Sequence, residues 1–100
     1  MKDEIIKVLV FKISGEYYAT NIIEVERITE YKKSNKIPDS PEFVEGVIEY
    51  ENNILPIISL AKIFKLPLSV IGEESKIIVA KQDNSKIGII VDSVSEVKDV

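Results

Sequence analysis

The 100-residue sequence contains no histidine and no cysteine, and these two absences exclude much of enzyme chemistry. Histidine is the side chain best suited to proton transfer near neutral pH. Without it, and without a thiol, neither a Ser-His-Asp triad nor a thiol–imidazole pair can form. Zinc sites built from Cys and His are excluded, and so are disulfide bonds. We therefore expect a protein that is not an enzyme and that carries no cofactor and no metal.

Strong helix formers are also scarce. The chain has only five Leu and three Ala residues, whereas Ile and Val together account for 29 residues. β-Branched side chains are stiff at χ1 and pack well on a pleated surface, so this composition favours strands. A chain of this length corresponds to about one domain. We expect a single, mostly β domain over residues 1–100.

Positive charge is dispersed along the chain. The 13 Lys and Arg residues are spread among 17 Asp and Glu residues, and the net charge is −4. No basic stripe exists to follow a phosphate backbone, so we expect no nucleic acid partner. The longest nearly apolar run, Ile54 to Ala61, is too short to span a bilayer. The charged residues 1–4 do not resemble a secretion signal, so we predict a cytoplasmic protein without direct membrane insertion.

Alternating apolar residues and turn signals predict about seven short strands. The expected strands are Ile5–Ile13, Tyr17–Thr20, Arg27–Tyr31, Val47–Glu51, Ile54–Ile58, Ile77–Lys81 and Ile87–Val91. Helical turns are expected at 22–25 after Asn21, at 42–45, at 60–66 after Ser59, and at 94–97. Hairpin turns are expected at 14–16 and 52–53, and Pro56 requires a sheet edge or a bulge. Short strands without a long helix favour a barrel or a sandwich.

Paired carboxylates are the remaining acid–base material. Glu49 and Glu51 lie at i and i+2 on an expected strand, where they would share one face. A glycosidase or a metal site requires such a pair. A solvated sheet face explains the same pattern, because glutamates are mostly exposed. A carboxylate-based hydrolase is therefore the less favoured alternative to a binding protein.

Four segments carry a more specific pattern than strand periodicity alone. In chain order they are Tyr18-Ala19-Thr20-Asn21-Ile22-Ile23-Glu24-Val25-Glu26-Arg27-Ile28, Pro41-Glu42-Phe43-Val44-Glu45-Gly46-Val47-Ile48, Ile54-Leu55-Pro56-Ile57-Ile58-Ser59-Leu60 and Gly88-Ile89-Ile90-Val91-Asp92-Ser93-Val94-Ser95-Glu96-Val97. In this order and at this spacing, the segments resemble the CheW family of chemotaxis coupling proteins. The resemblance extends from Ile6 to Val100.

The resemblance implies a fold and a role. The fold would be two small SH3-like β-barrels packed together with short helical turns. The role would be that of a non-enzymatic adaptor between the signalling domain of a chemoreceptor and the regulatory domain of a CheA-type histidine kinase, associated with membrane receptor arrays. Val25, Gly46 and Val47 are the apolar positions that we expect at the protein interface. Gly46 would let another backbone approach, or it would simply stop a helix.

One departure from the family concerns charge. Where the family typically has Asn-Leu-Arg-Gly and often Val-x-Glu-Ile, this chain has Glu49-Tyr50-Glu51-Asn52 and Val25-Glu26-Arg27-Ile28. We predict that Arg27 and Glu51 are a reversed ion pair that still meets in space at the protein interface. Like charges facing each other across an interface are unfavourable, so this reversal would change partner choice more than fold.

A second departure concerns the C-terminus. The family continues beyond this point with a further connection and closing strands, whereas the given sequence stops at Val100. We therefore expect one barrel to be incomplete at the C-terminus and to expose an unpaired sheet edge. A second copy of the chain, as a homodimer, or another protein would pair there. The alternative to a coupling adaptor is a divergent or truncated relative that self-associates or competes for one partner.

Overall fold

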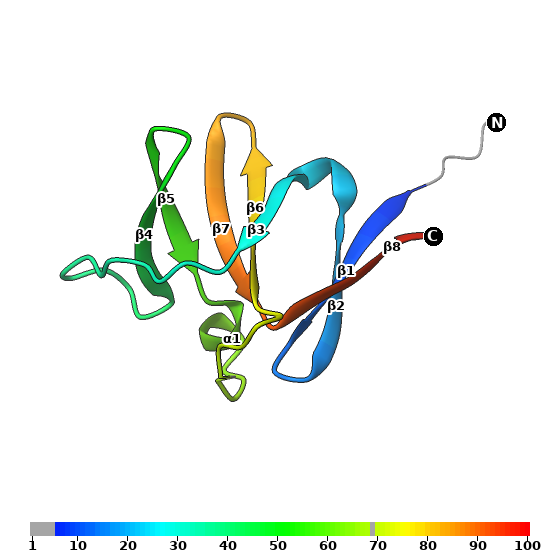
Figure 1. Cartoon of the computed structure of the whole chain (residues 1–100), viewed down its shortest axis with the longest axis horizontal. Helices are drawn as coiled ribbons and strands as arrows, with labels where there is room; N and C mark the ends of the chain where they lie inside the picture. Colours follow the sequence, from blue (N-terminus) through cyan, green and yellow to red (C-terminus); the bar gives the residue numbers. More distant parts are fainter. Residues whose placement is uncertain (1–5, 69) are drawn as a thin grey trace.

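The computed structural model describes residues 6–68 and 70–100, and strands dominate this part of the chain (Figure 1). In chain order the elements are β1 (Lys7–Ile13), β2 (Glu16–Asn21), a 3-10 turn (Ile22–Glu24), β3 (Val25–Glu30), β4 (Val44–Tyr50), β5 (Asn53–Ile58), α1 (Leu60–Ile63), β6 (Lys76–Gln82), β7 (Ser85–Val91) and β8 (Ser93–Asp99). Ile5, the expected first residue of the first strand, lies outside the described residues. None of the described helices is long and apolar enough to cross a membrane.

The strands form two sheets that lie side by side (Figure 1). The smaller sheet has the order β2-β1-β8, and the larger has the order β3-β6-β7-β5-β4. All pairs are antiparallel except β5 with β7, which pair in parallel at Ile57 and Ile58. The predicted mostly β fold is confirmed. Both sheets are open, and the described residues include no closed barrel.

β6 links two apolar cores because its two faces are both buried. Ile78 points into the first core, between the two sheets, and Ile77 and Val79 point into the second, within the five-stranded sheet. Alternate residues of a strand point to opposite faces, so a strand buried on both sides is a continuous apolar run. The first core contains Leu9, Phe11, Ile13, Ala61, Ile78 and Val91; the second contains Ile48, Leu55, Ile57, Ile77 and Val79.

The two predicted helix caps are confirmed. The Asn21 side chain accepts a hydrogen bond of 3.1 Å from the Ile23 backbone N–H, at the start of the 3-10 turn. The Ser59 hydroxyl accepts one of 3.2 Å from the Lys62 N–H, at the start of α1. These side chains replace partners that the first turn of a helix lacks. α1 ends at Ile63, three residues before the predicted end.

Two other predicted helical turns, at 42–45 and 94–97, are wrong. Residues 44 and 45 begin β4, and residues 94–97 lie within β8. The spacing of three between Val94 and Val97 comes from a β-bulge. These valines lie opposite Phe11 and Leu9, which are two residues apart on β1, and the bulge absorbs the extra residue on β8. The bulge opposite β1 thus gives Val94 and Val97 the spacing of three residues that is also typical of a helical turn.

Both predicted hairpins are present. Ser14 and Gly15 join β1 to β2 with φ of 54° and 80°, which suits a two-residue turn between twisted strands. The second turn is Glu51-Asn52, one residue earlier than predicted, with φ of 50° and 64°. Pro56 pairs with Val47 on one side, while the pairing of β5 with β7 begins only at Ile57. Pro56 therefore has a locally unpaired flank, as its missing N–H requires.

Candidate interaction surface

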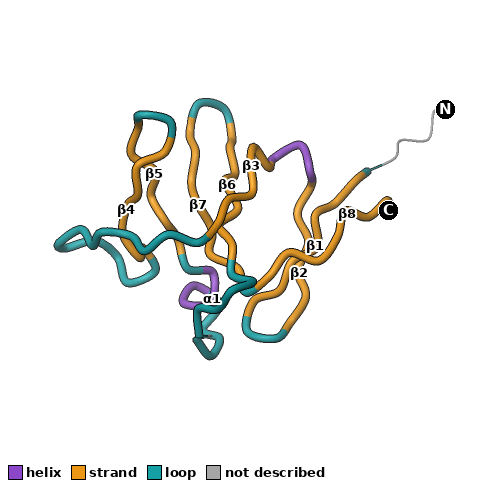
Figure 2. Tube along the Cα trace, in the orientation of Figure 1, coloured by secondary structure: helices purple, strands orange, loops and turns teal. Residues whose placement is uncertain are grey.

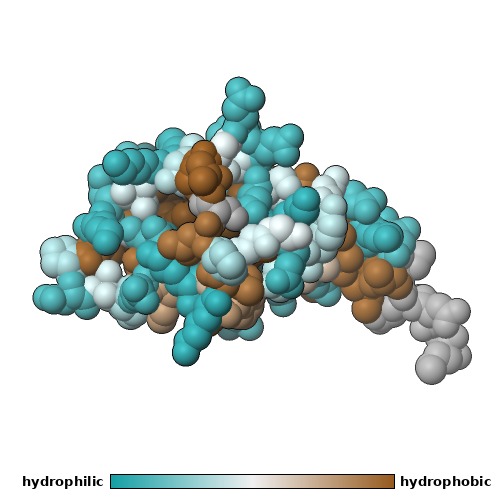
Figure 3. Space-filling model, turned by 90° about the horizontal axis from the view of Figure 1, so that it is seen from below, coloured by the Kyte–Doolittle hydropathy of each residue, from teal (hydrophilic) through white to brown (hydrophobic). Residues whose placement is uncertain are grey.

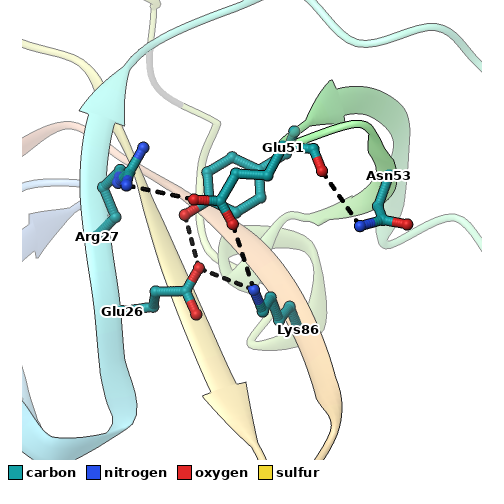
Figure 4. A network of polar contacts seen from close by, with 6 residues as sticks. Glu26, Arg27, Glu51, Asn53 and Lys86 are labelled. Carbon is teal, nitrogen blue, oxygen red and sulfur yellow. Dashed lines mark hydrogen bonds and ion pairs between the residues drawn. The ribbon is translucent and has the colours of Figure 1, made fainter.

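A network of polar side chains connects the two outer strands of the five-stranded sheet (Figure 4). We call it the clasp, and its members are Glu26 and Arg27 of β3, Tyr50 of β4, Glu51 of the following turn and Lys86 of β7. The Arg27 Nη2 and Glu51 Oε2 atoms are 3.3 Å apart. The predicted meeting of Arg27 and Glu51 is thus confirmed. The ion pair spans the gap between β3 and the β4–β5 hairpin.

Lys86 and Tyr50 complete the clasp. The Lys86 Nζ atom lies 3.0 Å from Glu26 Oε2 and 3.5 Å from Glu51 Oε1. The Tyr50 hydroxyl donates a hydrogen bond of 2.7 Å to Glu26 Oε2. The Tyr50 ring also has the Arg27 guanidinium and the Lys86 ammonium each 5.6 Å from its centroid, within the range of cation–π attraction. Each cation therefore contacts both an anion and the aromatic ring.

The clasp shifts the pKa values of three of its members. Hydrogen bonds from Tyr50 and then Lys86 lower the pKa of Glu26 below its usual value of 4.5. Burial, followed by the hydrogen bond to Glu26, raises the pKa of Tyr50. The hydrogen bond to Glu26 raises the pKa of Lys86. All three shifts favour the same charge state at neutral pH, with Glu26 ionised, Lys86 charged and Tyr50 neutral.

The central ion pair of the clasp remains accessible from outside. The side chains of Arg27 and Glu51 are 56% and 44% exposed. Exposed ion pairs add little stability, about 0–1 kcal/mol each, because water already solvates both charges. The Arg27–Glu51 pair therefore contributes little to the stability of the fold, and both of its charges stay in contact with solvent.

Gly46 and Val47 lie toward the other end of β4, beside the loop that connects β3 to β4. We call the pairing of this loop with β4, through Asn35 and Val47, the backbone closure. The loop that connects β3 to β4 passes beside β4 (Figure 2), and Asn35 and Val47 exchange two backbone hydrogen bonds of 2.9 Å. A Cβ atom at Gly46 would lie 2.3 Å from the Asn35 carbonyl oxygen. Gly46 thus permits close backbone approach, and the backbone is that of its own chain. Gly46 lies within β4, two residues after the strand begins at Val44, so the helix-stop interpretation is wrong.

Val25 lies at the junction of the two sheets. It is the first residue of β3 and is half-buried against the first core. A bulge in the pairing of β3 with β6 separates it from Arg27. The structure therefore brings Arg27 to Glu51, and Gly46 and Val47 to the backbone closure, whereas Val25 belongs to the core contacts. Glu26, Tyr50 and Lys86 were not predicted as site residues, because no local pattern connects three separate segments.

The carboxylate pair of the hydrolase alternative is not arranged for catalysis. Glu49 lies in β4, but Glu51 is in the turn with φ of 50°, so the i, i+2 geometry of a strand does not apply. The Glu51 carboxylate is also occupied by Arg27 and Lys86. Within the described residues, no group of three or more acidic side chains is placed to hold a metal ion.

An apolar face lies around α1 and the loop that follows it. Exposed there are Ile63, Phe64, Leu68, Val70 and Ile71. The view from below shows hydrophobic residues on this side of the molecule among hydrophilic neighbours (Figure 3). Exposed apolar clusters are common at protein interfaces.

Comparison with known proteins identifies the family. The family model described as a CheW-like domain matches residues 7–100. The chain belongs to the CheW-like family. It is 31% identical over 91 residues to the chemotaxis protein CheW of Bacillus subtilis, which covers 91% of this chain and 58% of that protein. It is 35% identical over 91 residues to the chemotaxis protein CheW of Thermotoga maritima, covering 88% and 58%.

A solved structure confirms the CheW-like fold. The scaffolding protein TtCheW from Thermoanaerobacter tengcongensis superposes with a TM-score of 0.91 at 33% sequence identity, covering 99% of this chain and 64% of TtCheW. The predicted family resemblance is thus confirmed. The chain spans less than two thirds of the length of each of these relatives.

Proposed function

We propose that residues 1–100 form one CheW-like domain that acts as a non-enzymatic chemotaxis adaptor. It would bind the regulatory domain of a CheA-type histidine kinase and the signalling domain of a chemoreceptor, on the cytoplasmic side of a receptor array. The observation that carries this proposal is the superposition of 99% of the chain on a protein described as a scaffold. The relatives described as chemotaxis proteins support it.

The clasp would set the choice of partner. The turn between β4 and β5 presents Glu51, with Arg27 beside it on β3. A partner suited to this order of charges has a cation facing Glu51 and an anion facing Arg27. A partner suited to the reverse order would place like charges together, which weakens binding. Val25, Gly46 and Val47 would support this surface from within the fold.

The test measures binding of two probes, the kinase regulatory domain and the receptor signalling fragment of the same organism. The key variant is Arg27→Glu/Glu51→Arg, which reverses the direction of this ion pair and also removes the contact of Glu51 with Lys86, so circular dichroism must first show that the variant keeps its fold. We expect this variant to bind its own partners about tenfold more weakly or worse, since a charge placed against a like charge costs more than about 1.4 kcal/mol. Isothermal titration calorimetry measures both affinities.

The matched control reverses a different ion pair of the same sheet. Lys76 and Glu30 pair at 3.4 Å between β6 and β3, outside the clasp. The variant Glu30→Lys/Lys76→Glu should bind as the unchanged chain does. Equal binding by the Arg27/Glu51 variant would refute the specificity role. Failure of the unchanged chain to bind either probe would refute the adaptor role itself.

A second candidate function is competition for one partner without coupling the kinase to the receptor. What supports it is the order of charges in the Arg27–Glu51 pair, which the family resemblance implies is reversed and which would alter one partner surface without changing the fold. A reconstituted array of receptor, kinase and full-length adaptor separates the two functions. An adaptor sustains kinase activation when it replaces the full-length protein, whereas a competitor lowers the activation that the full-length protein provides.

A further inference from the structure

Glu51 is the member of the clasp whose two carboxylate oxygens contact different cations (Figure 4). Its Oε2 atom lies 3.3 Å from Arg27 Nη2, and its Oε1 atom lies 3.5 Å from Lys86 Nζ. An ionised carboxylate only accepts hydrogen bonds, and its two oxygens offer about four positions for them. A cation that a partner brings to Glu51 therefore competes with Arg27 at one oxygen and with Lys86 at the other.

Lys86 is held less firmly by Glu51 than by Glu26. The Lys86 Nζ atom is 3.0 Å from Glu26 Oε2, against 3.5 Å from Glu51 Oε1. The Glu26 side chain is 19% exposed and that of Glu51 is 44% exposed, so water screens the pair with Glu26 less. The hydrogen bond to Glu26 is also the largest cause that raises the pKa of Lys86, and Glu51 contributes less. Glu26 is therefore the main partner of Lys86.

The contacts that hold the Lys86 ammonium do not depend on Glu51. The Tyr50 hydroxyl donates a hydrogen bond of 2.7 Å to Glu26 Oε2, the same oxygen that Lys86 contacts, and so fixes the carboxylate. The Tyr50 ring centroid lies 5.6 Å from Lys86 Nζ and attracts the ammonium as well. If Lys86 loses its contact with Glu51, it keeps a carboxylate and an aromatic ring.

The backbone of Glu51 is held in place by its turn. Its φ is 50°, and the Asn53 Nδ2 atom donates a hydrogen bond of 3.2 Å to the Glu51 carbonyl. The carboxylate can therefore exchange one cation for another while the turn stays as it is. Arg27 is the nearer of its two cations, so Oε1, the oxygen beside Lys86, is the one where an exchange costs less.

We propose that Lys86 determines how strongly Glu51 binds a cationic side chain of a partner. In the free chain Lys86 occupies Glu51 Oε1; a lysine or arginine of the partner takes that place, and Lys86 stays with Glu26 and Tyr50. Arg27 remains paired with Oε2 throughout, so the exchange leaves no charge of the clasp without a counter-charge. The proposal rests on the proposed function, which supplies the partner, and it adds a residue that sets the affinity of the same site.

The first experiment needs no partner. ¹⁵N relaxation of the lysine ammonium groups measures how mobile the Lys86 side chain is, and the Lys86→Met chain assigns the Lys86 signal by its absence. Glu51→Gln should leave the order parameter of this ammonium nearly unchanged, because Glu26 and Tyr50 still hold it. Glu26→Gln should lower it. Equal losses in the two variants would overturn the exchange, since Glu51 would then hold Lys86 as firmly as Glu26 does.

The second experiment measures binding of the kinase regulatory domain and of the receptor signalling fragment by isothermal titration calorimetry. Lys86→Met removes the charge and keeps most of the apolar stem. It should bind at least one probe about two- to fivefold more tightly, the factor that corresponds to one exposed ion pair. Glu26→Gln should bind that probe more weakly by a similar factor, because Lys86 is then left to Glu51 alone. A merely structural role of the clasp would weaken binding in both variants.

Two controls separate the contact with Glu51 from the overall charge of this surface. Lys81 is exposed and lies directly opposite Lys86 in the pairing of β6 with β7, and the described residues give it no ion pair. Lys81→Met removes the same charge from the same sheet face and should leave the affinity nearly unchanged. In a Glu51→Gln chain, the further change Lys86→Met should no longer tighten binding, because the residue through which it acts is gone.

The binding results distinguish this proposal from the proposed function. An unchanged chain that binds a probe, with Lys86→Met no tighter or with Lys81→Met equally tight, overturns the role of Lys86 and leaves the adaptor function standing. Tighter binding by Lys86→Met that persists in the Glu51→Gln chain also overturns it. An unchanged chain that binds neither probe refutes the adaptor function, and the relaxation experiment still decides whether Glu26 or Glu51 holds Lys86.

Discussion

The two sheets differ in the contacts that connect their outer strands. In the five-stranded sheet, the gap between β3 and β4 is bridged twice, by the clasp near the β4–β5 turn and by the Asn35–Val47 backbone bonds farther along β4. In the three-stranded sheet, the described residues leave the outer edges of β2 and β8 without such a bridge. Within the described residues, contacts therefore link the outer strands of the larger sheet and not those of the smaller one.

This difference separates two ways of arranging the outer strands of a sheet. The clasp holds its side-chain charges between strands of one sheet, and under the proposed function these charges would discriminate partners without a change in the backbone. In the smaller sheet, the outer strands β2 and β8 both pair with β1 within the described residues. Substitutions that break the clasp or the backbone closure of the larger sheet test whether these contacts stabilise it.

The largest loss of stability should come from a substitution in the second core, within the five-stranded sheet. Ile77 is fully buried there. Ile77→Ala should lower the free energy of unfolding by about 2–5 kcal/mol, because it removes buried methyl groups and leaves a cavity. Urea denaturation measures the change. The matched control is Ile54→Ala at a position 72% exposed, which should change stability by less than about 0.5 kcal/mol. Comparable losses in both variants would mean that this core is not well packed.

A smaller effect should follow from breaking the backbone closure. Gly46→Ala places a Cβ atom against the Asn35 carbonyl, at a φ of 147° that side chains rarely adopt. We expect a loss of about 1–3 kcal/mol, together with faster hydrogen exchange of the Val47 N–H. Gly72→Ala is the control, because nothing lies within 4 Å of its added atom. Unchanged exchange at Val47 in Gly46→Ala would show that Gly46 does not maintain this closure.

The smallest effect should come from the clasp, and it should depend on pH. The pKa of Glu26 is lower in the folded chain than its usual value of 4.5. Its contribution to stability is therefore present above pH 4.5 and is lost as the pH falls through the lower folded value. Glu26→Gln should be less stable than the unchanged chain at pH 7, and the difference should vanish in acid. Thermal unfolding at a series of pH values measures it.

The control for this pH dependence is Glu49→Gln, on the same hairpin but outside the clasp. Its thermal unfolding at pH 7 should match that of the unchanged chain, because Glu49 makes no contact within the clasp. A Glu26→Gln difference that persists undiminished in acid would show that the ionised carboxylate is not what stabilises the clasp.

Local patterns predicted most of the strands and both caps. Asn21 and Ser59 act within three residues of themselves, and a strand such as Ile77–Lys81 is visible because its apolar side chains follow the burial of its faces. The errors arose where a distant partner sets the geometry. The spacing of Val94 and Val97 suggests a helical turn until the bulge opposite β1 is known.

The contact between Arg27 and Glu51 was predicted from the family resemblance and not from any local sequence pattern. The exchange of signs at Arg27 and Glu51, relative to the family, predicted that they meet, and they do. The same comparison gave no sign that Tyr50 and Lys86 join them. Those contacts depend on the relative positions of β4 and β7, which are separated in the five-stranded sheet by β5.

The absence of histidine and cysteine, the excess of Ile and Val and the order of the four family segments determined the class of protein. They did so because composition limits the available chemistry and alternation follows burial. Only the tertiary structure decided which charges share the clasp, why Gly46 must lack a side chain, and which strand pairs with β8. Each of these depends on strand register and sheet order, which bring together residues that no local pattern connects.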